Sequence, residues 1–236
     1  MLEINSIYNM DCLEGMKYMD NESIDIVITD PPYGVRKKEK WDDKIYFLNS
    51  LENWLKESYR VSKLGVIWFC ANKMIPDIMR IADKNNIAFH RLLVWNKPPG
   101  SQYAGAMNNK IWYSIEPILV FIKNEKLTKI KNIQNYSYSS FDARTIPQKI
   151  YSHPTVKPIN LIEWLVKHYS EEGYIILDPF IGSGTTAIAC INTNRNYIGF
   201  ELNKEYYEIA KNRINKHIIL SRTEEEVELC IQQKQR

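Results

Sequence analysis

The chain has 236 residues, of which 44% are hydrophobic and 25% charged, values that exclude an intrinsically disordered chain and fit one α/β domain. Its formal net charge of +3 is compatible with nucleic-acid binding but does not by itself indicate it. No apolar run approaches a membrane span and the first residues lack a signal-peptide pattern, so we expect a cytoplasmic protein that contacts no membrane.

Short apolar segments alternate with amphipathic ones, which is typical of an α/β sheet with crossover helices. The apolar runs predict strands at Ser6–Asn9, Asp25–Thr29, Gly65–Cys70, Arg91–Trp95, Glu116–Ile122, Tyr174–Leu177 and Tyr197–Phe200. The amphipathic runs predict helices at Tyr46–Ser62, Lys73–Lys84, Pro158–Tyr169, Thr185–Asn192 and Lys204–Lys216. The polar segment 221–236 has a weak helical pattern and is expected to form a terminal helix or a frayed end.

The four cysteines are Cys12, Cys70, Cys190 and Cys230, which lie far apart in the sequence. Their separation shows no metal-ligand spacing. We therefore expect reduced cysteines, partly in the core, and no metal site.

Two segments lack a regular pattern. Residues 34–44 form a charged stretch, and residues 124–153 combine basic and aromatic side chains without sustained periodicity. A loop of that length is usually functional or disordered, and this composition favours nucleic-acid contact, with a solvated loop as the alternative. The candidate DNA-binding residues are Arg36, Lys37, Lys38, Lys40, Lys129, Lys131, Tyr136, Tyr138 and Arg144.

The stretch ITDPPYG, residues 28–34, places a carboxylate, two prolines and an aromatic ring directly after a β-branched run. Asp tolerates turns and proline lacks an N–H, so Asp30 and Pro31 could simply end a strand. A strand stop does not explain why Pro32 and Tyr33 follow. We therefore interpret Asp30, Pro31, Pro32 and Tyr33 as a candidate catalytic motif, with the strand stop as the alternative.

A second motif lies in YIILDPFIGSGTTAIAC, residues 174–190. An apolar run leads into Asp178, Gly182 and Gly184 follow, and a helical pattern begins, so the backbone can approach a ligand closely. Glu201 ends the next apolar run, and an acidic residue about 20 residues after such glycines binds ribose hydroxyls in nucleotide-binding folds. Because G-x-G-x-x-G is incomplete, a nucleoside cofactor without phosphates, S-adenosylmethionine, fits better than a dinucleotide.

Together, the Asp30–Tyr33 motif and the element DPFIGSGTT, residues 178–186, resemble the paired signatures of amino-group DNA methyltransferases, which modify adenine N6 or cytosine N4. The first motif precedes the glycine element, and SHPTVKP (residues 152–158) lies just before the latter, an order that resembles the circularly permuted β group. The resemblance covers roughly residues 7–214. It implies a Rossmann-like α/β methyltransferase fold with a seven-stranded, mostly parallel sheet and helices on both faces. The implied catalytic domain is 1–220, with 124–153 a short target-recognition insertion and 221–236 a tail.

The resemblance also implies which residues contact the cofactor. Asp11 would contact its adenine, although Asp11 could equally be the N-cap of a helix at Leu13–Met19. His153, Thr155 and Lys157 would lie beside its methionine end, with an ordinary loop-to-helix entry as the alternative. The remaining candidates come from the glycine element and the following strand: Asp178, Pro179, Phe180, Gly182, Gly184, Thr185, Thr186 and Glu201.

An exocyclic amine is a poor nucleophile because its lone pair is delocalised into the ring. Two acceptors that each take one N–H would free the lone pair, and the Asp30 carboxylate and the Pro31 carbonyl can supply them. Tyr33 would then stack on a base that has left the duplex. Transfer from the sulfonium is direct and needs no cysteine nucleophile.

Three alternatives remain beside adenine-N6 methylation of DNA. Cytosine also presents an exocyclic amine, but Asp rather than Ser at position 30 resembles the adenine enzymes. A catalytically silent nucleic-acid-binding subunit is disfavoured by the two intact motifs, and a protein-glutamine methyltransferase would have Asn first and an unpermuted order. Besides DNA, a cognate restriction endonuclease and a second copy of the chain are candidate partners, although the sequence specifies neither.

Overall fold

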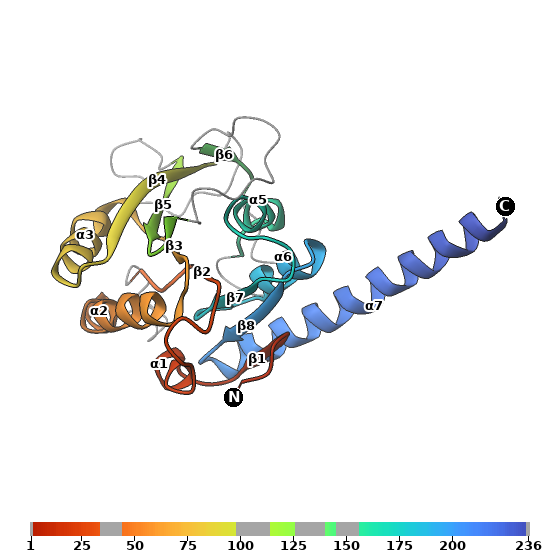
Figure 1. Ribbon diagram of the computed structural model, residues 1–236, viewed down its shortest axis with the longest axis horizontal. Helices are drawn as coiled ribbons and strands as arrows, with labels where there is room; N and C mark the ends of the chain where they lie inside the picture. Colours follow the sequence, from red (N-terminus) through yellow and green to blue (C-terminus); the bar gives the residue numbers. More distant parts are fainter. Residues whose placement is uncertain (1, 34–43, 98–113, 126–139, 145–155, 235–236) are drawn as a thin grey trace.

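The computed structural model describes residues 2–33, 44–97, 114–125, 140–144 and 156–234, with the backbone alone for 44–49 and 222–234. These residues form one eight-stranded sheet in the order β1-β8-β7-β2-β3-β5-β4-β6 (Figure 1). The strands are β1 Ser6–Tyr8, β2 Ile26–Thr29, β3 Gly65–Phe69, β4 Ala88–Asn96, β5 Ile115–Ile122, β6 Ser140–Asp142, β7 Ile175–Asp178 and β8 Asn196–Phe200. The helices are α1 Cys12–Met16, α2 Lys44–Val61, η2 Asn72–Met74, α3 Ile75–Lys84, α5 Ile159–Tyr169, α6 Thr185–Asn192 and α7 Lys204–Lys234.

The strands β1, β8, β7, β2 and β3 run parallel to one another, while β5 is antiparallel to both β3 and β4. This confirms the expected α/β fold with a mostly parallel sheet. The sheet has one strand more than the seven expected, because β6 pairs in parallel with the end of β4. The strand β6 is only three residues long, with the sequence Ser-Phe-Asp. It has no apolar alternation from which it could have been predicted.

Helices cover both faces of the sheet because the central strands are apolar on both sides. In β2, Ile26 and Ile28 pack with α5 and α6, whereas Val27 between them packs with α1, α2 and α3. Figure 1 shows the two groups of helices on opposite sides of the sheet. The alternation repeats in β3 and β5, so two buried clusters hold the central strands in a fixed register.

The last helix is longer than the sequence pattern predicts. It was expected to end at Lys216, but α7 continues to Lys234. Its first turns pack on the body through buried Ala210 and Ile214, and its far end extends away from the body in Figure 1. The division into a domain of 1–220 and a tail of 221–236 stays a prediction, as does the circular permutation. In the part of the chain that the structure describes, none of the helices has the length and apolar character needed to cross a bilayer.

Candidate functional site

A pocket lies at the carboxyl ends of β1, β8, β7 and β2. Because these four strands are neighbours and parallel, the residues that follow them meet at one edge of the sheet. Eleven of the predicted site residues line this pocket: Asp11, Asp30, Pro32, Lys157, Asp178, Pro179, Phe180, Gly182, Thr185, Thr186 and Glu201. Pro31, Tyr33 and Gly184 are neighbours in sequence of lining residues but do not line the pocket themselves. His153 and Thr155 lie outside the described residues.

The pocket also contains residues that the sequence patterns did not single out. Trp54 and Phe180 meet edge to face with ring centroids 4.9 Å apart, and Met10, Phe69, Leu202 and Tyr206 add further apolar surface. Trp54 belongs to α2, far from either motif in sequence. An aromatic residue on a helix face gives no signal that distinguishes a ligand pocket from the core. These side chains give the pocket the apolar walls that a purine ring requires.

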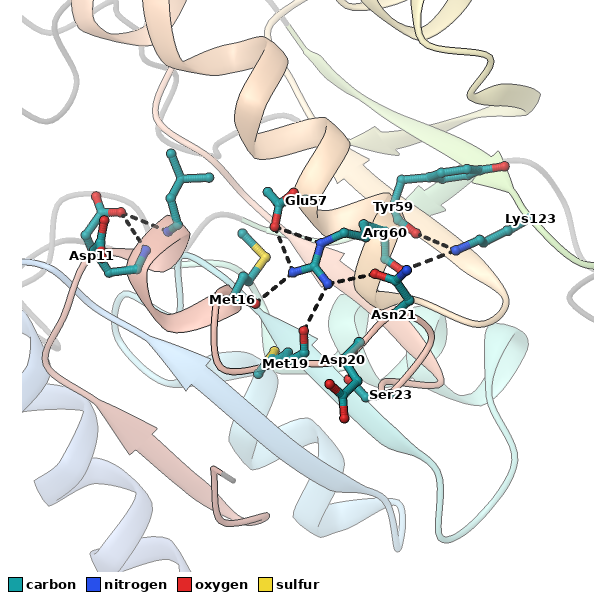
Figure 2. Close-up of polar contacts among 12 residues, drawn as sticks. Asp11, Met16, Met19, Asp20, Asn21, Ser23, Glu57, Tyr59, Arg60 and Lys123 are labelled. Atoms are coloured by element: carbon teal, nitrogen blue, oxygen red, sulfur yellow. Dashed lines mark hydrogen bonds and ion pairs between the residues drawn. The ribbon is translucent and has the colours of Figure 1, made fainter.

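Asp11 occupies the N-cap of α1, as the alternative interpretation proposed. Its Oδ1 accepts hydrogen bonds from the backbone N–H groups of Leu13 at 2.8 Å and Glu14 at 3.3 Å (Figure 2). The same side chain lines the pocket. Capping uses one carboxylate oxygen, so a ligand can still donate to the other.

Arg60 of α2 fixes the opposite end of α1. Its guanidinium donates to the carbonyl oxygens of Met16 at 2.8 Å and Met19 at 2.9 Å, and to Oδ1 of Asn21 at 2.9 Å (Figure 2). The carbonyls at the C-terminal end of a helix have no partner within the helix. A cation there donates hydrogen bonds to them and interacts favourably with the helix dipole. Arg60 thereby holds the helix whose N-cap is Asp11.

We expect Arg60→Met to lower the free energy of unfolding by roughly 1–3 kcal/mol, because buried carbonyls lose a charged donor. Denaturant unfolding measures this change. Lys17→Met is the matched control, since Lys17 is exposed and pairs with Glu14 on the protein surface. Equal stabilities for the two variants would show that Arg60 does not hold α1.

Asp178 connects the two motifs. Its carboxylate accepts from the Thr29 hydroxyl at 2.9 Å, the Phe180 N–H at 3.1 Å and the Thr186 hydroxyl at 2.6 Å. Burial raises the pKa of Asp178 to about 6, and these three donors limit the rise. Since Thr29 precedes Asp30 in the chain, Asp178 fixes the first motif relative to the glycine turn.

The glycine turn has the backbone geometry that glycine permits. Gly182 and Gly184 have φ of 51° and 81°, in the left-handed region. A Cβ at Gly184 would also come within 3.2 Å of Ile214 in α7. The turn therefore needs glycine at position 184 for conformation and for close packing.

Glu201 follows β8 and lies against the glycine turn. Its Oε2 accepts from the N–H of Gly182 at 3.1 Å, and its Oε1 accepts from the N–H of Asn203 at 2.8 Å. Burial raises the pKa of Glu201 to about 7, a rise that the backbone donors only partly offset. A carboxylate held this way retains lone pairs for a pair of hydroxyl groups in the pocket.

Asp30 lies in a cluster of charged side chains. Its Oδ1 accepts from the Tyr33 hydroxyl and its Oδ2 from the Lys157 ammonium. The sequence interpretation used only the ring of Tyr33 and placed Lys157 at the methionine end of a cofactor. In the structure the Tyr33 hydroxyl and the Lys157 ammonium both donate to the Asp30 carboxylate. The stacking role of Tyr33 stays a prediction.

Glu116 and Lys97 complete this cluster, and the sequence interpretation missed both. Oε1 of Glu116 lies 3.0 Å from the Tyr33 hydroxyl and 3.1 Å from the Lys157 ammonium, and its Oε2 lies 2.8 Å from the Lys97 ammonium. A signal was available, because Glu116 is a charged residue in an otherwise apolar strand. Its partners could not be predicted, since they come from distant parts of the chain.

Of the candidate DNA-binding residues, the structure describes Arg144 alone. It is exposed and follows β6. The other eight lie outside the described residues: Arg36, Lys37, Lys38, Lys40, Lys129, Lys131, Tyr136 and Tyr138.

The chain is similar in sequence and in fold to proteins named as DNA methyltransferases. The Type II methyltransferase M.HpaI of Haemophilus parainfluenzae is 34% identical over 87% of this chain and 72% of its own length. The DNA adenine methyltransferase YhdJ of Escherichia coli (strain K12) is 26% identical over 90% of this chain and 83% of its own. The crystal structure of the M1.HpyAVI–SAM complex is similar with a TM-score of 0.67 at 27% identity, covering 88% of this chain and 98% of that one. The DNA methylase family model N6_N4_Mtase matches residues 24–212, so the chain belongs to this family of DNA methyltransferases.

Proposed function

We propose that the protein transfers a methyl group from S-adenosylmethionine to the exocyclic N6 amine of adenine in DNA. The observation that carries this proposal is that Asp30 and Glu201 line one pocket, where they follow β2 and β8, the two strands on either side of β7. In this proposal Asp30 accepts from the amine to be methylated, and Glu201 accepts from the ribose hydroxyls.

The pocket residues fit this cofactor. Glu201 is a partly buried carboxylate that accepts from the backbone N–H groups of Gly182 and Asn203, and its remaining lone pairs are suited to accept from both ribose hydroxyls. Asp11 can accept from an adenine amine, and Trp54 and Phe180 provide apolar walls for the ring. When bound, the cofactor supplies an electrophilic methyl group on a sulfonium.

The chain's own residues prepare the target amine. Asp30 accepts one N–H and the backbone carbonyl of Pro31 accepts the other, so that the nitrogen lone pair points out of the ring plane. The direction of that carbonyl is restricted, because proline locks the φ of Pro31 and the following Pro32 limits its ψ to extended values. Asp178 holds the backbone before Asp30 in place through Thr29, while the Asp30 carboxylate accepts from Tyr33 and Lys157, donors with which the target amine has to compete.

Two observations support adenine over cytosine. The first position of the motif is Asp, and the relative YhdJ is named a DNA adenine methyltransferase. Incubation with methyl-labelled cofactor and unmethylated plasmid and genomic DNA, followed by nucleoside mass spectrometry, tests the proposal. We expect labelled N6-methyladenine. Labelled N4-methylcytosine would overturn the choice of base, and absence of any labelled nucleoside would favour a silent binding subunit.

Binding of the cofactor should depend on pH through Glu201. Ribose hydroxyls donate to the ionised carboxylate, so binding lowers the pKa of Glu201 from about 7. Affinity should therefore rise with pH, by up to about tenfold per unit below neutrality, and level off above it. Calorimetry over a pH series measures this effect. Glu201→Gln should flatten the rise, whereas a rise that survives in this variant belongs to another group, such as the cofactor's own amine.

We also propose DNA as the macromolecular partner. M.HpaI and other relatives are named Type II methyltransferases, which supports a cognate restriction endonuclease as a second candidate partner. A homodimer is the remaining candidate. Light scattering with and without DNA distinguishes one copy from two.

A further inference from the structure

Glu116 lies at the centre of the cluster around Asp30, although neither sequence motif includes it. Only 12% of its side chain is exposed, with 10% for Lys157 and 16% for Lys97. The position of Glu116 is set by the sheet, because it pairs with Trp95 in the antiparallel ladder between β5 and β4. A carboxylate with so little exposure loses most of its hydration, and the positive charges of Lys97 and Lys157 compensate for that loss.

Glu116 competes with Asp30 for the same two donors. The Lys157 ammonium contacts Oδ2 of Asp30 and also lies 3.1 Å from Oε1 of Glu116. The Tyr33 hydroxyl contacts Oδ1 of Asp30 and lies 3.0 Å from the same Oε1. A phenol has one proton to donate, so the hydroxyl bonds to one carboxylate at a time. When a donor bonds to Glu116, an oxygen of Asp30 is left free to accept a hydrogen bond from another donor.

We propose that Glu116 is a positioning residue for methyl transfer, which draws the Lys157 ammonium and the Tyr33 hydroxyl away from Asp30 and so keeps Asp30 available to the target amine. The inference rests on the proposed catalytic role of Asp30. Without Glu116, both donors would bond to Asp30 alone. Their hydrogen bonds would take lone pairs and negative charge that the amine N–H needs.

The charges around Asp30 set the direction in which its pKa shifts, and this direction can be measured. Burial raises the pKa of Asp30, Lys157 lowers it and Glu116 raises it. Asp178 and Cys70 also face this region, and Lys97 acts through Glu116. Lys157 and Lys97 hold the pKa of Glu116 below its usual range despite burial, so Glu116 is a constant negative charge.

The test compares single-turnover rates across a pH series, at saturating cofactor and DNA. Glu116→Gln should lower the rate at neutral pH by about tenfold, a smaller loss than that of a direct catalytic contact. The acid limb of its pH profile should move to lower pH. The reason is that the pKa of Asp30 falls when Asp30 loses a negative neighbour and no longer shares Lys157 with the Glu116 carboxylate. Lys97→Met should move the acid limb to higher pH, because it frees Glu116 to draw Lys157 further from Asp30.

Two further variants separate positioning from folding. Glu52→Gln is the matched control, since Glu52 pairs with Lys84 and Asn85 outside the pocket, and it should change neither rate nor profile. Tyr33→Phe removes one of the contested donors, so the loss caused by Glu116→Gln should shrink in that background. Cofactor affinity should stay within about twofold in the Glu116→Gln variant, because its effect is on the target amine.

The possible results have distinct meanings. A Glu116→Gln enzyme that loses rate only in proportion to a lower melting temperature, with an unmoved pH profile, would make Glu116 structural and overturn the inference. An unchanged rate would overturn it too, while the proposed function stands if Asp30→Ala is inactive. If Asp30→Ala is also active, the proposed function itself fails.

Discussion

Asp30→Ala is expected to lower the single-turnover rate of methyl transfer by on the order of 10²–10³, the loss seen when one preorganised hydrogen-bond partner of a reacting group is removed. Cofactor affinity should stay nearly unchanged, because Glu201 follows β8, which β7 separates from the strand β2 that precedes Asp30. Rapid-quench measurement of labelled DNA at saturating cofactor gives the rate, and calorimetry gives the affinity.

The variant also changes the charge cluster, so its fold must be measured. Removing Asp30 leaves Lys157 with the carboxylate of Glu116, which keeps the ammonium paired. We therefore expect a folded protein with a modest change in melting temperature. Asp30→Asn is the matched variant, because it preserves volume and one acceptor oxygen but loses the charge, and it should retain more activity than Asp30→Ala.

The opposing interpretation is that Asp30 and the prolines only end β2. It predicts that activity falls in step with unfolding and by no more. A folded Asp30→Ala protein with a near-normal rate would support it, and the silent binding subunit would then become the better explanation of the fold.

The fold could be predicted because its central strands carry unambiguous patterns. Runs such as Ile26–Thr29 are apolar on both faces, which requires helices on both sides, and this is what the two buried clusters show. The meeting of Asp11, Asp30, Asp178 and Glu201 could be predicted for the same reason. Each follows a parallel strand, and the ends of neighbouring parallel strands lie at one edge.

The charge cluster could not be predicted in this way. Glu116 reaches Asp30 because β5 is antiparallel to β3 and β4, a register fixed by long-range pairing. Lys157 arrives from the segment before α5, 127 residues after Asp30. No local pattern encodes such meetings. The strand β6 was missed for the opposite reason, because its local pattern is weak. A terminal helix was one of the two expectations for residues 221–236, but its continuity with the helix expected at Lys204–Lys216 was not predicted.

The same geometry makes Glu201 the residue on which cofactor binding should depend most. In Glu201→Ala the ribose hydroxyls lose a charged acceptor, and hydrogen bonds to charged groups contribute about 1.5–3 kcal/mol each. The loss of one such hydrogen bond alone would raise the dissociation constant for S-adenosylmethionine by roughly 10- to 100-fold, at about 1.4 kcal/mol per factor of ten, so we expect a rise of at least this size. Affinity for DNA in the absence of cofactor should not change.

Glu201 also orders the glycine turn, so a loss of affinity could arise indirectly. Its Oε2 accepts from Gly182 and its Oε1 from Asn203, and Glu201→Ala removes both contacts. Glu201→Gln keeps one acceptor oxygen and the side-chain volume, so it preserves more of the turn while still removing the charge. If the negative charge of Glu201 beside the ribose hydroxyls is what matters, Glu201→Gln should weaken binding nearly as much as Glu201→Ala. Its melting temperature should be closer to that of the unmodified chain. Binding that recovers fully in Glu201→Gln would instead make Glu201 a support for the turn, and unchanged binding in both variants would place the ribose elsewhere.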